Sequence, residues 1–392
     1  MRTGRLQYEA QIASGVDFAA GDLETSAGPG RLRYIRTTDI RSQTELSATG
    51  VFVSENQVPV TARVAAGDLL FTRAGPVGTS YLHVGPEAAF AGYLVRCRVK
   101  PRHDPRYFAY WAQSRPFWDQ VAVGAVRSTI DNFSGSKYAA MAVPLPEPEV
   151  QRRIADYLDT QARRIDRLIE LNHRAGSLAW DRFRGSRQHL LVGDRLLGDP
   201  AAVNDICQRG WDVMPLWMVC RNLDGRRIPL NSEERGQRPG PYPYWGANAV
   251  QGYIDQWLFE GPHVLIGEDG APYFDERRDV AWVADGKFWV NNHAHVLEPT
   301  LVPADWLAEC LNVVDYSQYV VGSTRDKLTQ AALNSIPIPV PPAEDREQIL
   351  AQLGTHREVA KALEQSVEAN VALLTERRAA LVTAAVTGEL EV

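Results

Sequence analysis

Apolar residues recur every seven positions along two stretches of the sequence, a pattern typical of long helices that pair along a narrow seam. In the stretch nearer the C-terminus, the recurring positions are Leu353, Ala360, Val367, Leu374 and Leu381. The second seam position of that stretch is assigned to Ile349, His356, Leu363, Asn370 and Arg377. Because polar residues interrupt the seam, the pattern favours a coiled-coil pair over a helix buried in a core.

The same pattern appears 195 residues earlier in the chain. Its positions are Leu158, Ile165, Asn172, Ala179 and Ser186, with Ile154, Gln161, Leu168 and Ala175 at the second seam position. The two stretches belong to two copies of one module, residues 128–194 and 323–389, which align without a gap at this offset. The chain is therefore predicted to be a tandem duplication. A pseudo-two-fold protein suits a ligand with two related halves, and duplex DNA is the obvious candidate.

A proline-rich hinge precedes each predicted helix. The hinges, residues 143–148 and 336–342, carry prolines at alternate positions, which exclude a helix or a central strand and predict a stiff, extended segment. Each helix of roughly 40 residues would be about 60 Å long. If the two helices pair antiparallel, they act as a spacer that holds one globular domain at each end. The alternative is that each helix packs on its own domain.

The stretches between the helices predict mixed α/β domains. Short β-like runs such as 68–71, 93–97 and 263–266 alternate with segments rich in Gly, Pro and aromatic residues. The predicted fold class is α+β, with two globular α/β domains joined by two long antiparallel coiled-coil helices in a pseudo-two-fold tandem repeat. The predicted domains are residues 1–143 (globular), 144–200 (hinge and helix), 201–338 (globular) and 339–392 (hinge and helix).

Composition narrows the class of protein. Hydrophobic residues make up 45% of the chain and charged residues 23%, which is ordinary for a globular protein. No apolar run reaches the roughly 18 residues of a membrane span, and the first ten residues lack the apolar core of a signal peptide, so a cytoplasmic location is expected. The four cysteines form no metal-ligand spacing, which favours reduced thiols over a zinc site.

The net charge of −6 is distributed unevenly. Residues 1–145 hold 16 basic and 12 acidic side chains, a net charge of +4, whereas residues 200–340 hold 11 and 18, a net charge of −7. Any contact of the second half with DNA therefore has to depend on local basic clusters or on a partner.

The hinges and helices resemble the specificity (S) subunit of type I restriction-modification systems. The C-terminal stretch Leu373–Leu381 (LLTERRAAL), followed by Ala385–Val392 (AVTGELEV), is similar to the ending of that family. The segment Pro144–Leu158 (PLPEPEVQRRIADYL) resembles its other signature, and Pro339–Leu353 (PVPPAEDREQILAQL) is a second copy. Two regions depart from the family pattern: the first 30 residues match nothing in it, and Trp180–Leu191 lacks the Glu-Arg-Arg run.

The globular stretches resemble the family's recognition domains. The segments that carry this resemblance are Tyr34–Ile40, Gly67–Gly75, Gly240–Asn248, Val264–Ala271 and Asn291–Leu297. The resemblance implies a noncatalytic subunit in which each globular domain is a target recognition domain for one half of a bipartite, asymmetric site on double-stranded DNA. It also implies that the helices set the spacer between half-sites and dock two methyltransferase (M) subunits, which restriction (R) translocase-nuclease subunits join. No cofactor is expected on this chain; S-adenosylmethionine, ATP and Mg²⁺ are expected on the partner subunits.

Candidate DNA contacts follow from chemistry, because Arg, Lys, Ser and Thr contact phosphates, and Arg, Asn, Gln and aromatic residues in loops contact bases. In the first globular domain the candidates are Arg36, Thr37, Thr38, Arg41, Arg73, Gly75, Arg127, Ser128 and Thr129. In the second they are Tyr244, Asn248, Asn291, Asn292, Ser323, Thr324, Arg325 and Lys327. Candidates for the coiled coil and for partner docking are Ile154, Leu158, Ile165, Leu168, Ile349, Leu353, Leu363, Val367, Leu374 and Leu381. Any single candidate can instead be an ordinary turn residue; Arg36, for example, can simply pair with Asp39.

Signals for catalysis are weak. The chain has no phosphate-binding GxxxxGK[ST] loop. His293 and His295 are expected on one face of a β-like run, without an evident third metal ligand, and the glycines that flank Glu268-Asp269 indicate a tight turn rather than acid–base work. Two alternatives stay open: an assembly scaffold of a phage-defence complex without its own sequence reading, and a nuclease or methyltransferase domain on a coiled-coil dimeriser.

Overall fold

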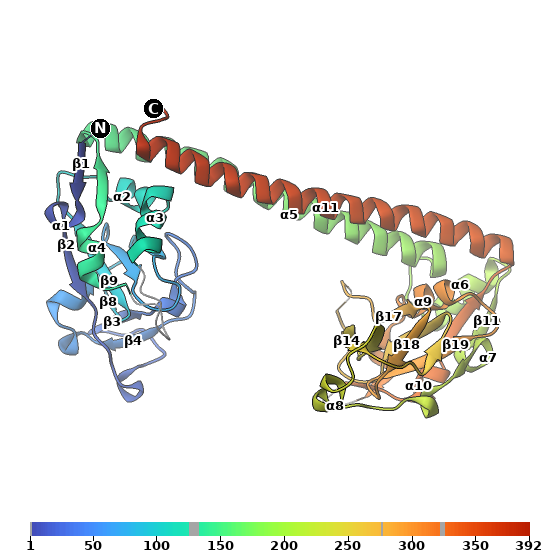
Figure 1. The fold of residues 1–392 in the computed structure, drawn as a ribbon. Coiled ribbons are helices and arrows are strands. Elements are labelled where there is room, and N and C mark those ends of the chain that lie inside the picture. Colours follow the sequence, from blue (N-terminus) through green and yellow to red (C-terminus); the bar gives the residue numbers. More distant parts are fainter. Residues whose placement is uncertain (1, 125–132, 276, 322–325) are drawn as a thin grey trace. The chain divides into compact units, whose positions relative to one another are not determined.

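The computed structural model describes residues 2–124, 133–275, 277–321 and 326–392 (Figure 1). It divides into two compact units, Met1–Asn172 with Ala369–Val392, and His173–Glu368. Each unit contains one globular head and part of both long helices, α5 (Pro148–Val192) and α11 (Ala343–Thr387), which have 45 residues each. Among the described residues, no helix combines the length and the apolar character needed to cross a bilayer.

The first head contains two four-stranded sheets. One has the order β2 (Ala10–Ser14), β9 (Leu94–Val99), β6 (Leu69–Thr72), β7 (Ser80–Leu82). The other has the order β4 (Val51–Ser54), β3 (Arg31–Ile35), β8 (Ala88–Phe90), β5 (Arg63–Val64). The neighbours in both sheets pair antiparallel except β3 and β8, which run parallel.

The second head repeats this topology strand for strand. Its sheets have the orders β12 (Cys220–Asn222), β19 (Ala294–Pro299), β16 (His263–Gly267), β17 (Ala281–Ala284), and β14 (Val250–Ile254), β13 (Tyr242–Trp245), β18 (Lys287–Val290), β15 (Phe259–Glu260). The parallel pair is again the equivalent one, β13 with β18. The duplication thus includes the heads, and the predicted fold class is confirmed.

Strand register identifies equivalent residues in the two heads. Tyr34 lies opposite Ala89 in the parallel pair of the first head, and Tyr244 lies opposite Trp289 in the second. Thr72 lies opposite Leu94, and Gly267 lies opposite Ala294. Tyr34 is therefore equivalent to Tyr244, and Thr72 to Gly267.

The proline-rich hinges form strands of two-stranded antiparallel sheets. β10 (Ala142–Leu145) pairs with β1 (Arg2–Arg5), and β22 (Pro337–Val340) pairs with β11 (Asp212–Pro215). Proline is tolerated because each of these strands has a neighbour on one side alone, so its missing N–H group leaves no central ladder incomplete. The extended hinge predicted from the alternating prolines is confirmed.

Short helices complete each head. In the first head they are α1 (Leu6–Glu9), α2 (Pro105–Trp111), α3 (Arg115–Gly124) and α4 (Gly135–Ala140). In the second head they are α6 (Pro200–Gln208), α7 (Leu216–Val219), α8 (Ser232–Gly236), α9 (Ala304–Leu311) and α10 (Gln330–Asn334), and β20 (Val320–Val321) pairs with β21 (Lys327–Leu328).

The helices α2 and α9 hold the hinge strands in equivalent ways. The Tyr107 hydroxyl on α2 donates to the Pro144 carbonyl at 2.9 Å, and the Trp306 indole N–H on α9 donates to the Pro339 carbonyl at 2.8 Å. Tyr107 and Trp306 are both fully buried.

The two long helices pair antiparallel within each unit. In the first unit, Leu158 of α5 shares a hydrophobic cluster with Val382 and Val386 of α11. In the second unit, Phe183 and Leu191, near the end of α5, share a cluster with Leu353 and Ala360, near the start of α11. The start of each helix therefore lies beside the end of the other.

The structure agrees with the predicted seam at the first of its two recurring positions. Leu353, Ala360 and Val367 are buried, and Leu374 and Leu381 are half-buried, as the seven-residue pattern predicts.

At the second position the prediction is right near the start of each helix, where Ile154 and Ile349 are buried, and wrong by one residue further along. Leu168 and Leu363 are 46% and 37% exposed, whereas Val371 and Arg378 are half-buried in place of Asn370 and Arg377. The buried positions shift by one residue along each helix, and a strict seven-residue pattern does not follow that shift.

The alternative of helices packed on their own domains holds for their first turns. Ile154 and Leu158 join the core of the first head, and Ile349 and Leu353 join the core of the second. Further along α11, Val367 lies within ordinary contact distance of Gly176 on α5, where a Cβ would be 3.6 Å away. Each helix is thus anchored to its own head and then paired with the other helix.

Candidate nucleic-acid interface

Three loops of the first head come together at one edge of its sheets. These loops follow β3, β6 and β8 and comprise residues 36–41, 73–78 and 91–93. Together they are called the first loop edge. The Ala91 N–H donates to the Ile35 carbonyl at 2.9 Å, and the Arg73 N–H donates to the Tyr93 carbonyl at 2.9 Å. The backbone thus joins the ends of β3 and β6 to the turn between β8 and β9.

The second head builds the same edge with different side chains. Residues 246–249, 268–271 and 291–293 form the second loop edge. The Asn291 N–H donates to the Trp245 carbonyl at 3.0 Å, and the Glu268 N–H donates to the His293 carbonyl at 2.8 Å. These bonds repeat those of the first edge, so Arg73 is equivalent to Glu268, and Tyr93 to His293.

A glycine with positive φ makes the same turn in both edges. Gly75 has a φ of 76° and Gly270 a φ of 65°, a conformation that other L residues rarely adopt. The tight turn expected around Glu268-Asp269 is therefore present.

In the first loop edge, Arg36 fixes the loop that follows β3. Its guanidinium donates two hydrogen bonds of 3.0 Å to the buried carboxylate of Asp39. Burial alone would raise the pKa of Asp39, but the hydrogen bonds from Arg36 outweigh burial and hold this pKa below its ordinary value. Arg36 therefore positions the loop that carries the half-buried Thr37 and the exposed Thr38.

Two other arginines of this edge have their charge available. Arg41 is exposed and Arg73 is half-buried. Within the described parts of the chain, neither guanidinium forms a hydrogen bond or an ion pair. Both are suited to contact an anionic backbone.

In the second loop edge, cations compensate the acidic side chain. The Glu268 carboxylate lies 2.8 Å from the Arg227 guanidinium and 3.1 Å from the Lys327 ammonium. Burial would raise the pKa of Glu268, but the hydrogen bonds from Arg227 and Lys327 lower it overall. The exposed Lys327, a predicted DNA contact, thus lies beside the edge with its charge already paired.

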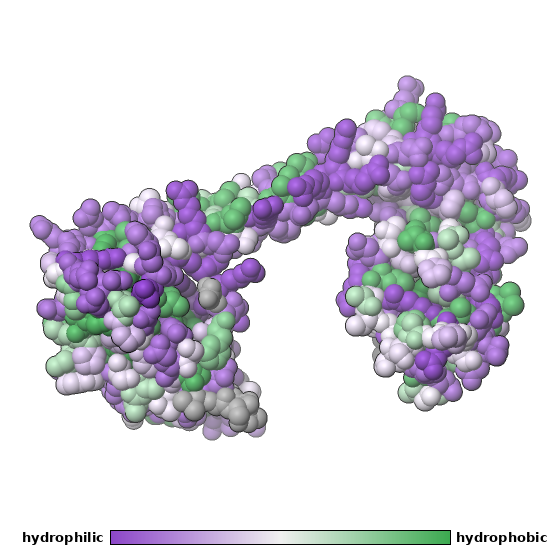
Figure 2. Space-filling model, turned by 180° about the vertical axis from the view of Figure 1, so that it is seen from behind, coloured by the Kyte–Doolittle hydropathy of each residue, from purple (hydrophilic) through white to green (hydrophobic). Residues whose placement is uncertain are grey.

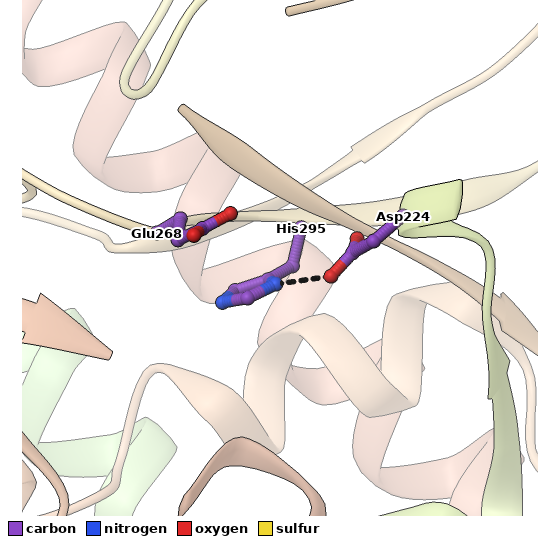
Figure 3. Close-up of side chains that lie close together, drawn as sticks. All are labelled: Asp224, Glu268 and His295. Atoms are coloured by element: carbon purple, nitrogen blue, oxygen red, sulfur yellow. Dashed lines mark hydrogen bonds and ion pairs between the residues drawn. The ribbon is translucent and has the colours of Figure 1, made fainter. Parts of the chain in front are cut away.

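Beneath this edge lies a polar cluster of the half-buried Asp224 and Glu268 and the buried His295 (Figure 3). Figure 3 shows the His295 ring with Asp224 on one side and Glu268 on the other. The His295 Nδ1 lies 2.6 Å from the Asp224 carboxylate, and its Nε2 lies 2.9 Å from the Leu328 carbonyl. Both ring nitrogens thus face oxygen atoms that can accept a hydrogen bond.

This arrangement opposes metal binding. The possible ligand atoms lie within 4.8 Å of one another, but each is already engaged. Arg227 lies near both carboxylates, 3.6 Å from that of Asp224. Burial would raise the pKa of Asp224, but the hydrogen bond and charge of His295 and the charge of Arg227 hold it below its ordinary value. The cluster is best described as a satisfied ionic network that supports the second loop edge.

His293 does not share a strand face with His295, and that expectation is wrong. β19 begins at Ala294, so His293 belongs to the preceding turn. Its Nδ1 lies 2.9 Å from the Asp269 carboxylate.

Two predicted base contacts are wrong because the side chains are buried. Tyr244 is fully buried, and its hydroxyl donates to the Leu230 carbonyl and accepts from the Leu230 N–H. Asn291 is buried, and its side-chain oxygen accepts from the His293 N–H at 2.8 Å. Both residues stabilise the edge from within, and Tyr34 does the same through the Val16 carbonyl at 2.8 Å.

The remaining described candidates reach the surface of the edges. Asn248 and Asn292 are exposed, and the Asn248 amide donates to the Gly270 carbonyl at 3.0 Å. Six candidates lie outside the described residues: Arg127, Ser128, Thr129, Ser323, Thr324 and Arg325. The described residues just after these candidates contact the loop edges. The Phe133 N–H donates to the Arg73 carbonyl in the first edge, and the Leu328 N–H donates to the Glu268 carbonyl in the second.

Sequence reasoning missed two residues of these edges. Tyr93 is 60% exposed in the turn of the first loop edge, where it offers an aromatic face. Arg227 organises both carboxylates below the second. An exposed aromatic in a turn was a usable signal, but nothing in the local sequence connects Arg227 to Glu268.

Residues 208–372, the second head and much of α11, match the family described as Type I restriction modification DNA specificity domain. A putative type I restriction enzyme specificity subunit of Haemophilus influenzae is 37% identical over 137 residues, 35% of this chain and 34% of that protein. The EcoprrI specificity subunit of Escherichia coli is 29% identical over 126 residues, 31% of this chain and 30% of that protein. The matches thus span about a third of the length of these relatives.

Solved structures extend the likeness to the whole fold. A chain from a structure of the type I R-M system, concerned with its complex assembly and conformational transition, has a TM-score of 0.74 at 17% identity, covering 99% of this chain and 98% of that one. The HsdS subunit from Thermoanaerobacter tengcongensis has a TM-score of 0.52 at 17% identity, covering 99% and 97%. Residues 208–372 are thus similar to a type I DNA specificity domain, and the chain has the fold of these solved structures. The resemblance to the specificity subunits of type I restriction-modification systems is confirmed.

Proposed function

We propose that this chain is the noncatalytic DNA-recognition subunit of a type I restriction-modification complex. It binds a bipartite, asymmetric site through two target recognition domains, residues 1–143 and 201–338. The segments 144–200 and 339–392 set the distance between half-sites. The observation that carries this proposal is that two heads of identical strand order present different side chains on equivalent loop edges.

The loop edges suit the two tasks of DNA recognition. Buried anchors such as Asp39, Tyr244 and Asn291 fix the loop backbones. Rigid loops lose little entropy on binding, which favours discrimination between sequences. Exposed side chains then contact phosphates, through Arg41 and Arg73, or base edges, through Asn248 and Asn292.

Chemistry is assigned to partner subunits in this proposal. Asp224, Glu268 and His295 are engaged with one another and with Arg227 and Lys327, which leaves them poorly placed for acid–base work. S-adenosylmethionine, ATP and Mg²⁺ would be bound by the methyltransferase and restriction subunits.

The long helices would dock those subunits. Figure 2 shows hydrophobic residues among hydrophilic ones along the helices on the face in view. The exposed apolar residues of α5 and α11 are Leu168, Leu171, Leu178, Val359, Leu363 and Leu373. Apolar side chains that stay exposed beside a packed seam are typical of a surface that a partner covers.

Mapping methylated bases in the host genome tests the proposal. Wild-type cells should show a bipartite methylated motif that disappears when this gene is deleted and returns on complementation. A motif that survives deletion would contradict sequence recognition by this chain. Loss of methylation without any bipartite motif would instead favour an assembly scaffold.

A further inference from the structure

The two loop edges place opposite charges at equivalent positions. Arg73 and Glu268 follow equivalent strands, and both donate their N–H to the carbonyl of the equivalent turn residue. The carbonyls of Arg73 and Glu268 also accept from equivalent donors, the N–H groups of Phe133 and Leu328. A positive side chain in one head therefore replaces a negative one in the other on the same backbone.

The first loop edge has an excess of positive charge. Its loops contain Arg36, Arg41 and Arg73 against a single acid, Asp39, whose charge Arg36 compensates. One further carboxylate, that of Asp17, accepts a hydrogen bond from the Gly92 N–H at 3.0 Å and offsets part of this excess.

The second loop edge is compensated internally. Its loops contain Glu268 and Asp269 and no Lys or Arg. Arg227 and Lys327 approach from neighbouring segments, and both lie within 3.1 Å of the Glu268 carboxylate. Cations held by a protein carboxylate release few counterions from DNA, so this edge contributes little to salt-dependent attraction.

We propose that the two heads bind their half-sites by different physical means. The first loop edge holds the DNA backbone electrostatically through Arg41 and Arg73. The second recognises its half-site mainly through neutral amides, Asn248 and Asn292, while Glu268 keeps Arg227 and Lys327 away from phosphates. This inference rests on the proposed function, because it divides DNA recognition between the two edges.

Two matched variants test the proposal, because they should change the salt dependence of DNA binding in opposite directions. Arg73→Gln and Glu268→Gln remove opposite charges at equivalent positions and leave the same neutral amide in both heads; this amide is nearly isosteric with Glu and shorter than Arg. The assay is binding of the assembled complex with its methyltransferase subunits to a duplex that carries the methylated motif, at several salt concentrations. Arg73→Gln should lower the slope of log K against log salt by about 1, as loss of one phosphate contact requires. Glu268→Gln should steepen the slope and tighten binding at low salt, because it frees the exposed Lys327 ammonium, while Arg227 stays paired with Asp224.

A control and two contrary outcomes complete the experiment. Lys100→Gln removes an exposed cation just beyond the other end of β9 and should leave the slope unchanged. A shallower or unchanged slope for Glu268→Gln overturns the division of roles, since it would mean that Glu268 does not restrain Lys327. If the wild-type complex fails to bind the duplex, the proposed function itself is wrong and the inference is overturned with it. Thermal unfolding of each variant separates loss of fold from loss of contact.

Discussion

In the first head, the Tyr110 hydroxyl on α2 donates to the Asp159 carboxylate on α5 at 2.6 Å, whereas in the second head the buried Glu309 on α9 pairs with Arg357 on α11. Tyr110 and Glu309 are equivalent, because each lies three residues after the side chain that holds its hinge strand, Tyr107 or Trp306. At this equivalent position a hydrogen bond in one head replaces an ion pair in the other, and in the first head Arg106 on α2 adds ion pairs to Asp156 and Asp159.

A second pair of equivalent buried residues also differs in chemistry between the two heads. In the first head, buried Glu9 pairs with Arg102 and His103. The equivalent residue of the second head is Val219, because the Lys100 N–H donates to the Glu9 carbonyl and the Thr300 N–H donates to that of Val219. Val219 packs in an apolar cluster with Val302. Strand register and turn geometry thus preserve the fold while the buried side chains at equivalent positions differ in chemistry between the two heads.

The largest effect on stability is expected from a variant that breaks the ion pair between α9 and α11 in the second head. Glu309→Ala should cost about 1.5–3 kcal/mol of stability in the second unit, because it leaves half-buried Arg357 without its carboxylate, while buried Arg187 keeps its ion pair with Asp279. Tyr110→Phe, at the equivalent position, removes one hydrogen bond and should cost about 1 kcal/mol in the first unit. Native-state hydrogen exchange, which reports on each unit separately, measures both costs. Equal losses would mean that the two contacts do not differ as described.

A smaller effect tests whether the two buried tyrosines are equivalent. Tyr34→Phe and Tyr244→Phe each remove a hydroxyl that anchors an upstream backbone segment, so each should cost about 0.5–1.5 kcal/mol. Because Tyr244 is buried, its variant should keep the methylated motif of the wild type. Sequencing of methylated bases checks this expectation, and a changed half-site would restore Tyr244 as a base contact.

The smallest effect is expected on the pH dependence of the stability of the second unit. The pKa of Asp224 is held below its ordinary value of 3.8, so its ion pairing stabilises the fold above about pH 4 and is lost as the pH falls through the lowered pKa. Asp224→Asn should therefore destabilise the second unit near pH 7 and make its stability less dependent on pH below about 4. Urea midpoints between pH 3 and 7 measure this, and parallel curves for variant and wild type would contradict it.

Local signals predicted the helices and hinges well, because period, proline spacing and repeat offset are all properties of neighbouring residues. The duplication of the heads was hidden because loop lengths differ. The offset between equivalent strands is 195 residues from Leu69 to Val264, but 200 from Val99 to Pro299 and 210 from Ala10 to Cys220. A gapless alignment cannot follow such changes, whereas strand register does.

The site was predicted in part, because loop composition is a local signal whereas burial is not. Asn248 and Asn292 are exposed as expected, since they lie in loops whose composition marks them as surface. Asn291 has the same residue type but is buried, and Tyr244 is buried too, because burial depends on contacts that are distant in the sequence. The second seam position was missed beyond the first turns because the buried positions shift by one residue along the helices, for example from Ile349 to Arg357 on α11, and a strict seven-residue pattern does not follow that shift.

The prolines of the hinge strands have a consequence for solubility. An unpaired strand edge is a template for intermolecular β-pairing and aggregation. In β10 and β22, Pro144, Pro337 and Pro339 supply no N–H groups, so a strand from another molecule would meet an interrupted row of donors. The residues that stiffen each hinge therefore add to the cover that Tyr107 and Trp306 give the same strands, and replacing these prolines with Thr or Val would restore the missing donors.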